Sequence, residues 1–326
     1  RRKTGQRTTR ENLEDLVDPD SFVEYGPLVI AAQRRRRPVS ELIERTPADG
    51  MVAGIGRVNG DAFDADRSRT VVMSYDYTVL AGTQGTMNHV KKDRLIELAE
   101  RSRLPVVFFT EGGGGRPGDT DGTGVAGLDC LAFWYFGRLS GQVPMVGITS
   151  GRCFAGNAAL LGTCDVVIAT EGSNIGMGGP AMIEGGGLGV FRPDEVGPLA
   201  AQRRNGVVDV AVKDEAEAVA VAKRYLSYFQ GPVDRWDCSD QRLLRHLIPE
   251  NRLRVYDVRR VLHTIMDTDS VLELRRDFGL GVHRRCIVGR RPAGAGVLRR
   301  ERRGAGQRGQ AQPADAGSGI RLSTAS

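Results

Sequence analysis

The chain has 326 residues, a formal net charge of +6 at neutral pH, 40% hydrophobic residues and 43 glycines. This length suffices for one large or two ordinary domains with a buried core. No apolar run reaches the roughly 18 residues that a membrane span requires, so we do not expect a membrane protein.

The distribution of charge and the pattern of cysteines argue against several classes of function. Residues 283–326 hold ten arginines against one glutamate and one aspartate, so this tail carries +8 and the rest of the chain −2. A mildly acidic body argues against nucleic-acid binding. The five cysteines are odd in number and form no Cys-x-x-Cys pair. We therefore expect neither a metal site nor a disulfide framework, and a reducing cytoplasm fits.

The first part of the chain predicts a helix, a linker and a strand pair. Within residues 10–23, Leu13, Leu16 and Val17 share one helical face, and Pro19 is expected to end that helix. The four arginines at 34–37 precede a proline, as in a solvated linker. Two strands, 51–58 and 70–80, are expected to form a hairpin at Asn59-Gly60, because Asn-Gly is typical of tight hairpin turns.

A loop of small residues at 82–89 then leads into a helix predicted at 90–101. Its first turns carry Lys91 and Lys92, although positive charge opposes the helix dipole at that end. Two interpretations stay open: solvated surface lysines, or lysines that bind the phosphate of a ligand.

Two glycine-rich loops follow apolar strands in the middle of the chain. The strand 104–109 leads into Glu-Gly-Gly-Gly-Gly-Arg at 111–116, and the strand 143–148 into Gly-Arg-Cys-Phe-Ala-Gly at 151–156. Small residues at strand ends let the backbone approach a ligand. Two such loops can direct N–H donors at one point, which is how proteins stabilise an oxyanion.

The first loop also matches a dinucleotide-binding fingerprint at Gly113-x-Gly115-x-x-Gly118, but we reject that match. Pro117 and Asp119 prevent a helix from starting directly after the loop, as the Rossmann turn requires.

The remaining pattern alternates strands, loops and helices. The spacing predicts helices at 127–139, 155–161 and 215–229, and strands at 165–169 and 207–212. This alternation favours an α/β fold with ligands at the carboxyl ends of the strands.

Four ordered segments carry a family resemblance. They are Asp-Tyr-Thr-Val-Leu-Ala-Gly-Thr-Gln-Gly at 76–85, the loop at 111–116, Gly-Arg-Cys-Phe-Ala-Gly-Asn-Ala at 151–158 and Met-Gly-Gly-Pro-Ala-Met-Ile at 177–183. From about Thr8 to Val282 the chain resembles the carboxyltransferase (β) subunit of biotin-dependent acyl-CoA carboxylases, of the acetyl- or propionyl-CoA type without a zinc ribbon. The resemblance implies the crotonase-like (ClpP/crotonase) ββα superhelix of the N-terminal carboxyltransferase domain.

The resemblance also implies a mechanism. An acyl-CoA loses its α proton, and backbone N–H groups hold the enolate, with Gly114 and Gly115 on one side and Ala155 and Gly156 on the other. Carboxybiotin on a carrier protein supplies the carboxyl group and the base, so no metal is implied in this subunit. The further residues that it implies in contacts to CoA or biotin are Gly82, Gly85, Lys91, Lys92, Arg116, Gly178 and Gly179. Implied partners are biotin carboxylase, the biotin carboxyl carrier and further copies of the chain.

Three departures from the family pattern occur in the two glycine loops. Glu111, Arg152 and Phe154 stand where the family usually has Asp, Pro and Ala. No departure removes a backbone donor, but we expect Phe154 to affect the acyl-chain preference.

We expect four regions. An N-terminal helical and linker segment at 1–48 precedes the carboxyltransferase N-terminal domain at 49–268, and the start of a C-terminal half at 269–282 precedes the Arg/Gly/Ala-rich tail at 283–326. The tail has no sustained apolar periodicity, so we expect it to be disordered or frame-shifted, with a functional basic tail as the alternative. Without a second half, carboxyl transfer by this chain alone is expected to be weak or absent.

Two other functions stay open. A crotonase-like hydratase, isomerase or thioesterase acting on acyl-CoA would need a side-chain acid or base beside the loops, and the carboxylates placed to serve are Glu111, Asp119, Asp121 and Glu184. An inactive, structural carboxylase subunit would join the assembly without turnover.

Overall fold

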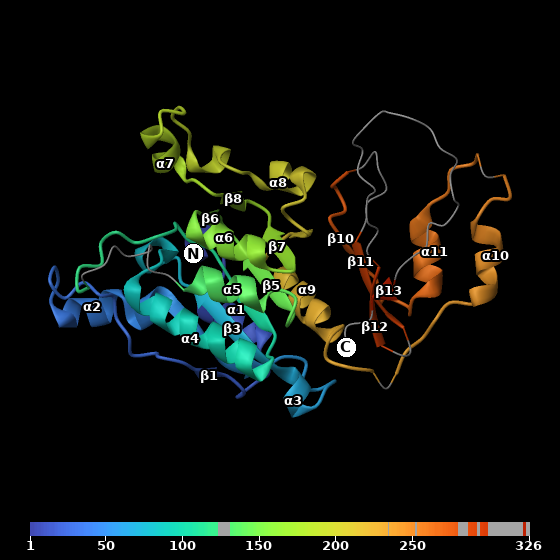
Figure 1. The fold of residues 1–326 in the computed structure, drawn as a ribbon, viewed down its shortest axis with the longest axis horizontal. Coiled ribbons are helices and arrows are strands. Elements are labelled where there is room, and N and C mark those ends of the chain that lie inside the picture. Colours follow the sequence, from blue (N-terminus) through green and yellow to red (C-terminus); the bar gives the residue numbers. More distant parts are fainter. Residues whose placement is uncertain are drawn as a thin grey trace. The chain divides into compact units, whose positions relative to one another are not determined.

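The computed structural model describes residues 1–122, 131–233, 235–251 and 253–279, together with the backbone of 286–291, 294–298 and 322–323. The chain forms two compact units, Arg1–Gln230 and Gly231–Ser326, and each is described by itself. Figure 1 shows the elements of both units along the chain.

A seven-stranded sheet organises the first unit, with the strand order β1-β2-β3-β4-β5-β7-β9. Strands β1, β2 and β3 pair antiparallel, and β3, β4, β5, β7 and β9 pair parallel. Two further strands, β6 and β8, form a small parallel pair of their own. The bounds are β1 (Val23–Glu24), β2 (Met51–Arg57), β3 (Arg69–Tyr75), β4 (Val106–Phe109), β5 (Met145–Thr149), β6 (Arg152–Phe154), β7 (Val166–Thr170), β8 (Asn174–Gly176) and β9 (Val210–Val212).

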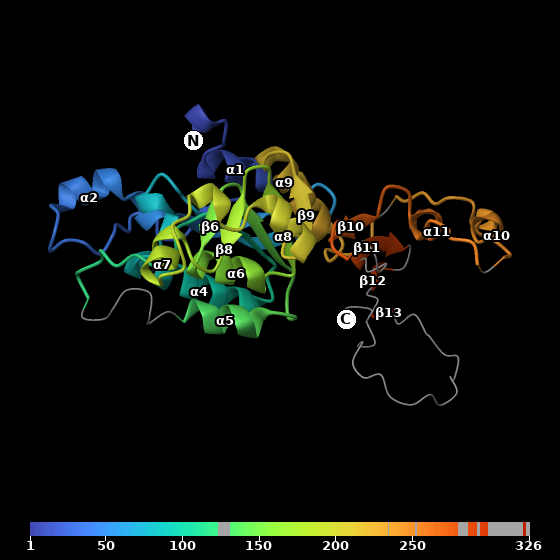
Figure 2. The same ribbon diagram turned by 90° about the horizontal axis from the view of Figure 1, so that it is seen from above.

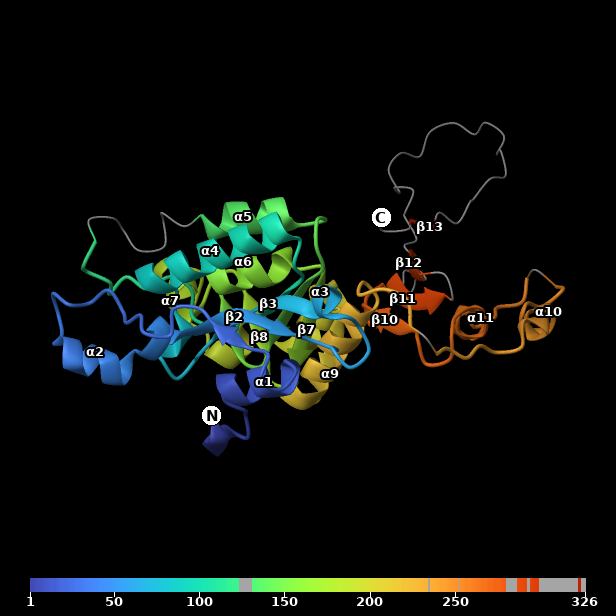
Figure 3. The same ribbon diagram turned by 90° about the horizontal axis from the view of Figure 1, so that it is seen from below.

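Helices cover both faces of this sheet. Figures 2 and 3 show α4, α5 and α6 on one face and α1 and α9 on the other. The helices of the unit are α1 (Thr9–Leu16), α2 (Val39–Arg45), α3 (Ala65–Ser68), α4 (Thr86–Ser102), α5 (Ala132–Leu139), α6 (Gly156–Thr163), α7 (Pro180–Gly185), α8 (Leu199–Asn205) and α9 (Glu215–Ser227). Because both faces are covered, every residue of β4, β5 and β7 is buried.

The main core lies between the sheet and helices α4 and α5. Phe108 of β4 stacks on Tyr75 at 5.4 Å and meets Phe136 of α5 edge to face at 5.9 Å between ring centroids. Leu95 and Ile96 bring the apolar side of α4 into the same cluster. Burying each such side chain stabilises the fold by about 1.5–3 kcal/mol, so the aromatic cluster anchors the strand that leads into the first glycine loop.

Local sequence signals explain how the two helices on the other face begin. Thr8 caps α1 with a capping box, in which its side chain accepts from the Glu11 N–H and Glu11 accepts from the Thr8 N–H at 2.7 Å. Asp214 caps α9 by accepting from the Glu217 N–H at 3.0 Å.

The predicted α/β alternation is confirmed, with corrections of detail, one of which is that the strand expected at 70–80 ends at Tyr75. Strands β2 and β3 are antiparallel as expected, but Asn59 and Gly60 do not make a two-residue turn, because residues 58–68 and helix α3 connect the strands. Helix α4 begins at Thr86 and not at residue 90. Part of the helix predicted at 127–139 lies outside the described residues, and α5 accounts for the rest.

The second unit combines short helices with an antiparallel sheet. Its helices are α10 (Leu244–Leu247) and α11 (Val258–Ile265), and its strands are β10 (Leu272–Leu274), β11 (Cys286–Arg291), β12 (Gly294–Leu298) and β13 (Leu322–Ser323), paired in that order. Strands β11 to β13 belong to the tail at 283–326. The rest of that tail lies outside the described residues, so the expectation of a disordered or frame-shifted tail stays a prediction.

Two searches of the described residues bear on function. No described helix has both the length and the apolar character to cross a membrane. No group of three or more His, Cys, Asp or Glu in the described ranges is placed to hold a metal ion.

Candidate active site

The two glycine-rich loops lie side by side at the carboxyl ends of β4 and β5. The Gly112 N–H donates to the Arg152 carbonyl at 2.8 Å, and the Phe154 N–H donates to the Gly112 carbonyl at 2.9 Å. A Cβ atom built on Gly114 would stand only 2.7 Å from the Cβ of Ala155. The structure thus brings together the two loops that the sequence singled out.

Two of the four N–H groups predicted as enolate donors already have protein acceptors. The Gly114 N–H donates to Asn157 Oδ1 at 3.0 Å, and the Ala155 N–H donates to the Gly176 carbonyl at 3.0 Å. The N–H groups of Gly115 and Gly156 make no hydrogen bond to any described residue. Of the four predicted donors, Gly115 and Gly156, one from each loop, are therefore the two whose N–H groups have no acceptor among the described residues, and their role stays a prediction.

The orientation of the peptide groups explains why the N–H groups of Gly115 and Gly156 have no acceptor among the described residues. In a trans peptide the N–H points away from the preceding C=O. The Gly114 carbonyl accepts from the Gln84 N–H at 2.7 Å, so the Gly115 N–H points away from Gln84. The Ala155 carbonyl accepts from the Ala159 N–H inside α6 at 3.0 Å, so the Gly156 N–H points out of the helix start, where the helix dipole favours negative charge.

Ala155 turns the chain from β6 into α6 in a conformation that alanine rarely adopts. Its backbone angles are φ 51° and ψ −123°. Such a conformation costs about 1–3 kcal/mol and persists only where the surroundings impose it. Here it sets the direction of the Gly156 peptide, and we regard the strain as part of the site.

A family match completes the description of these loops. The profile of the carboxyl transferase domain family matches residues 1–290. The chain belongs to this family.

Individual relatives agree with the family match. The methylmalonyl-CoA carboxyltransferase 12S subunit of Propionibacterium freudenreichii subsp. shermanii is 29% identical over 289 residues, which cover 84% of this chain and 52% of that protein. The propionyl-CoA carboxylase beta chain of Roseobacter denitrificans is 25% identical over 295 residues, covering 85% and 54%. The chain therefore spans about half the length of the curated relatives it matches.

Solved structures show the same fold. A single-chain, multi-domain long-chain acyl-CoA carboxylase is 59% identical with a TM-score of 0.86, and the match covers 91% of this chain and 29% of that one. The hexameric transcarboxylase 12S structure with hydrolysed methylmalonyl-CoA bound is 26% identical with a TM-score of 0.75, covering 91% and 58%. The predicted crotonase-like α/β fold of a carboxyltransferase domain is confirmed.

Within this carboxyltransferase domain, the Arg116 side chain is buried and contacts other parts of the protein. It is 4% exposed and forms ion pairs with Asp49 at 2.5 Å and with Asp119 at 3.5 Å. It also donates to the Thr83 carbonyl at 2.9 Å. Arg116 therefore ties the first glycine loop to the segment before α4, and a contact between Arg116 and a ligand stays a prediction.

Gly82 and Gly85 make close packing possible in the segment before α4. Gly82 has φ +61°, and a Cβ atom on it would approach the Glu111 carbonyl oxygen to 2.5 Å. A Cβ on Gly85 would collide with the Arg116 guanidinium. Both glycines hold this segment against the first loop.

Lys91 and Lys92 are not solvated surface lysines, which was one of the two interpretations left open by the sequence. They are 2% and 0% exposed. Lys91 Nζ donates to the Met51 carbonyl at 2.5 Å, and burial lowers the pKa of Lys91 to about 8. Because both ammonium groups contact the protein's own oxygens, we no longer assign them to a phosphate.

Gly178 and Gly179 lie in the turn that leads into α7. Gly179 is the residue before the helix, and a Cβ on it would stand 3.7 Å from the Phe154 ring. Phe154 itself is 6% exposed and packs toward this turn. The structure places both glycines beside the second loop, and a ligand contact there stays a prediction.

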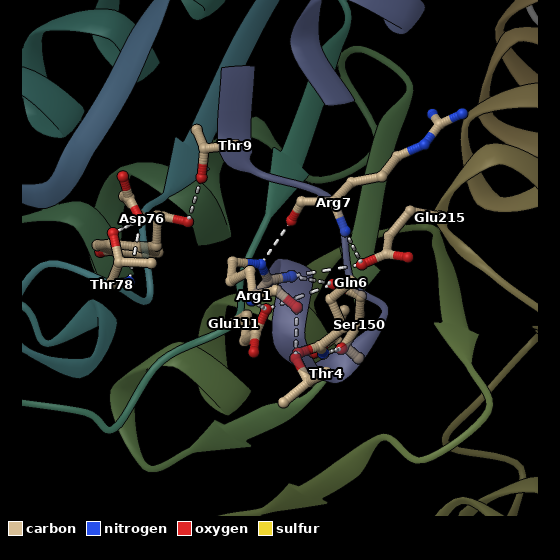
Figure 4. A network of polar contacts seen from close by, with 12 residues as sticks. Arg1, Thr4, Gln6, Arg7, Thr9, Asp76, Thr78, Glu111, Ser150 and Glu215 are labelled. Carbon is tan, nitrogen blue, oxygen red and sulfur yellow. Dashed lines mark hydrogen bonds and ion pairs between the residues drawn. The ribbon is translucent and has the colours of Figure 1, made fainter. Parts of the chain in front are cut away.

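Glu111 belongs to a buried network that the sequence did not suggest. Figure 4 shows the Arg1 guanidinium between Glu111, Ser150 and Glu215. It pairs with Glu111, donates to Ser150 Oγ at 3.0 Å and lies 3.4 Å from Glu215. Gln6 adds a bond to the Ser150 carbonyl. These contacts join residues far apart in the chain, so no local pattern predicts them.

Three of the four carboxylates that a hydratase, isomerase or thioesterase would use form hydrogen bonds or ion pairs with other protein groups. Glu111 is paired as above, and burial raises its pKa. Asp119 accepts from the Thr86 N–H at 2.8 Å and from Gln33 at 3.1 Å, and Asp121 pairs with Arg34 at 2.7 Å. Glu184 lies exposed on α7.

Proposed function

We propose that this domain transfers a carboxyl group from carboxybiotin to the α carbon of an acyl-CoA, through an enolate held by the N–H groups of Gly115 and Gly156. The observation that carries the proposal is a pair of N–H groups on two adjoining loops that make no hydrogen bond to any described residue. Each donor of this kind contributes about 2.7–4 kcal/mol to the stabilisation of an oxyanion.

The chemistry needs no base from this chain. When bound, carboxybiotin supplies the carboxyl group and, after releasing it, the group that takes the α proton. The two N–H groups act on the thioester oxygen, where negative charge develops as that proton leaves. The engagement of Glu111, Asp119 and Asp121 with protein partners supports this reading over a hydratase, isomerase or thioesterase. Among the described residues we assign none to biotin.

For the acyl group, we propose a long-chain acyl-CoA. The sequence led us to expect acetyl- or propionyl-CoA, and the relative from Roseobacter denitrificans at 25% identity is a propionyl-CoA carboxylase beta chain. The solved relative at 59% identity is a long-chain acyl-CoA carboxylase. Phe133 of α5 offers apolar surface beside the donors, since its ring lies 3.1 Å from a Cβ built on Gly156. Acetyl- and propionyl-CoA stay the alternative.

The chain spans about half the length of the curated relatives it matches. We propose that a second carboxyltransferase half completes the biotin side and that biotin carboxylase and a biotin carrier act with it in the cytoplasm. We also propose assembly with further copies, as in the hexameric transcarboxylase 12S subunit. A purely structural subunit remains the competing proposal.

The test is an acyl-CoA series. Acetyl-, propionyl- and palmitoyl-CoA are titrated by calorimetry, and carboxylated product is then measured by mass spectrometry with a carboxylated biotin carrier, with and without a separately expressed second half of a relative. We expect binding that is tightest for palmitoyl-CoA and turnover that rises when the second half is added. Hydrolysis or hydration of the acyl group would contradict the proposal, and binding without turnover under both conditions would favour the structural subunit.

A further inference from the structure

A buried chain of hydrogen bonds leads from helix α4 to the two loops of the site. Lys92 Nζ donates to Gln84 Oε1 at 3.0 Å and to the Tyr75 hydroxyl at 2.9 Å. Gln84 Nε2 donates to Asn157 Oδ1 at 3.1 Å, and the same oxygen accepts from the Gly114 N–H at 3.0 Å. Lys92, Gln84 and Asn157 are 0%, 2% and 0% exposed.

We propose that Lys92 and Gln84 are positioning residues that hold the Gly115 N–H toward the substrate oxygen by fixing the direction of this hydrogen-bond chain. The proposal rests on the proposed carboxyl transfer. It adds two side chains, neither of which touches the substrate, to a site built from backbone donors.

The direction of the chain follows from the chemistry of its members. A protonated lysine only donates, so the Gln84 side chain must turn its oxygen toward Lys92 and its nitrogen toward Asn157. Asn157 must then present its oxygen to Gln84 and its nitrogen to the other side. That nitrogen donates to the Thr110 carbonyl at 3.1 Å and to the Gly82 carbonyl at 3.3 Å.

The last links reach the candidate donor itself. With its oxygen so placed, Asn157 accepts the Gly114 N–H, while the Gln84 backbone N–H holds the Gly114 carbonyl at 2.7 Å. These two bonds fix both sides of Gly114, and the peptide that follows carries the Gly115 N–H. Gln84 also lies beside the second donor, since its Nε2 is 2.9 Å from a Cβ built on Gly156.

Two substitutions test the chain at different links. Gln84→Glu keeps the size of the side chain and an oxygen for Lys92 but offers Asn157 a second oxygen, so Asn157 must turn and release the Gly114 N–H. Lys92→Met keeps the unbranched stem and removes the donor that sets the direction. The matched control is Lys91→Met, because Lys91 is equally buried on the same helix but donates to the Ala48 and Met51 carbonyls.

The first readout is hydrogen exchange in the free protein, which does not depend on turnover. We expect the peptide containing residues 110–116 to lose protection in Gln84→Glu and Lys92→Met and to keep it in Lys91→Met. Unchanged protection in both test variants, or an equal loss in the control, would overturn the proposal.

The second readout separates this proposal from the proposed function. Wild-type carboxylation tests the function by itself. If it is present, we expect kcat to fall by about tenfold or more in the two test variants, with KM for acyl-CoA within about threefold, because the lost contact acts on the transition state. A kcat within about twofold of the Lys91→Met value in both test variants would overturn the positioning role.

Discussion

Gly114 and Ala155 occupy a contact that admits only one side chain. A Cβ on Gly114 would stand 2.7 Å from the Ala155 Cβ, and Gly114 has φ +90°, a backbone conformation that side chains rarely adopt. The close approach of the two loops, and with it the spacing of the Gly115 and Gly156 donors, therefore depends on this glycine.

We expect Gly114→Ala to separate the loops. Steric overlap and the strained backbone should lower the free energy of unfolding by about 1–3 kcal/mol and reduce acyl-CoA carboxylation. Thermal melting and the carboxylation assay measure the two effects. Gly137→Ala is the control, because this glycine lies in α5 with open space around its Cβ position, and alanine favours a helix. A Gly114→Ala protein as stable and active as that control would contradict the tight contact.

Arg116→Met should destabilise the fold by about 3–5 kcal/mol, because it leaves Asp49 and Asp119 buried without their cation. Denaturant unfolding measures the loss. Arg69→Met is the comparison, since the Arg69–Asp66 pair is exposed on both sides and should contribute about 0–1 kcal/mol. Equal losses of stability in the two variants would show that the buried ion pairs of Arg116 stabilise the fold no more than an exposed pair does.

Glu111 should give stability a pH dependence with a defined sign. Burial, the largest cause, raises the pKa of this carboxyl above its unfolded value, although Arg1 opposes the shift. Between the two pKa values the folded state binds the extra proton, so stability falls as pH rises through that acidic window.

Glu111→Gln should remove this component. We expect the melting temperature of the wild type to decline more steeply than that of the variant as pH rises above the ordinary range of a carboxyl group, and melting curves across a pH series measure the difference. Parallel curves would mean that Glu111 titrates as it does in the unfolded chain.

The sequence predicted the parts of this molecule that local pattern determines. Apolar strands that end in Glu111–Arg116 and Gly151–Gly156 indicated two ligand-facing loops, and the structure places them together. The sequence did not predict which of the four N–H groups have protein acceptors. Those acceptors are Asn157 and the Gly176 carbonyl, which reach the loops only in the folded chain.

The sequence did not reveal which charged residues are buried, because their partners lie far away along the chain. For Lys91 and Lys92 the sequence left a solvated surface and a ligand phosphate open and did not suggest burial, because their partners Met51 and Tyr75 come from neighbouring strands. The pairing of Arg1 with Glu111 and Glu215 escaped notice for the same reason. Nothing in the local sequence indicates that the side chains of Gln84 and Lys92 are hydrogen-bonded to each other.

The proposed enolate site depends most directly on the Gly156 N–H, and an amide-to-ester replacement isolates this donor. Glycolic acid in place of Gly156 removes the N–H without adding a side chain and leaves the backbone of Ala155 unrestricted, whereas proline would force Ala155 out of its observed conformation. Melting curves establish that the ester protein folds, and its carboxylation of acyl-CoA is compared with that of the wild type. We predict a kcat about 10²–10³ lower for the ester protein, with a similar KM. Equal kcat values in the two folded proteins would contradict the enolate site.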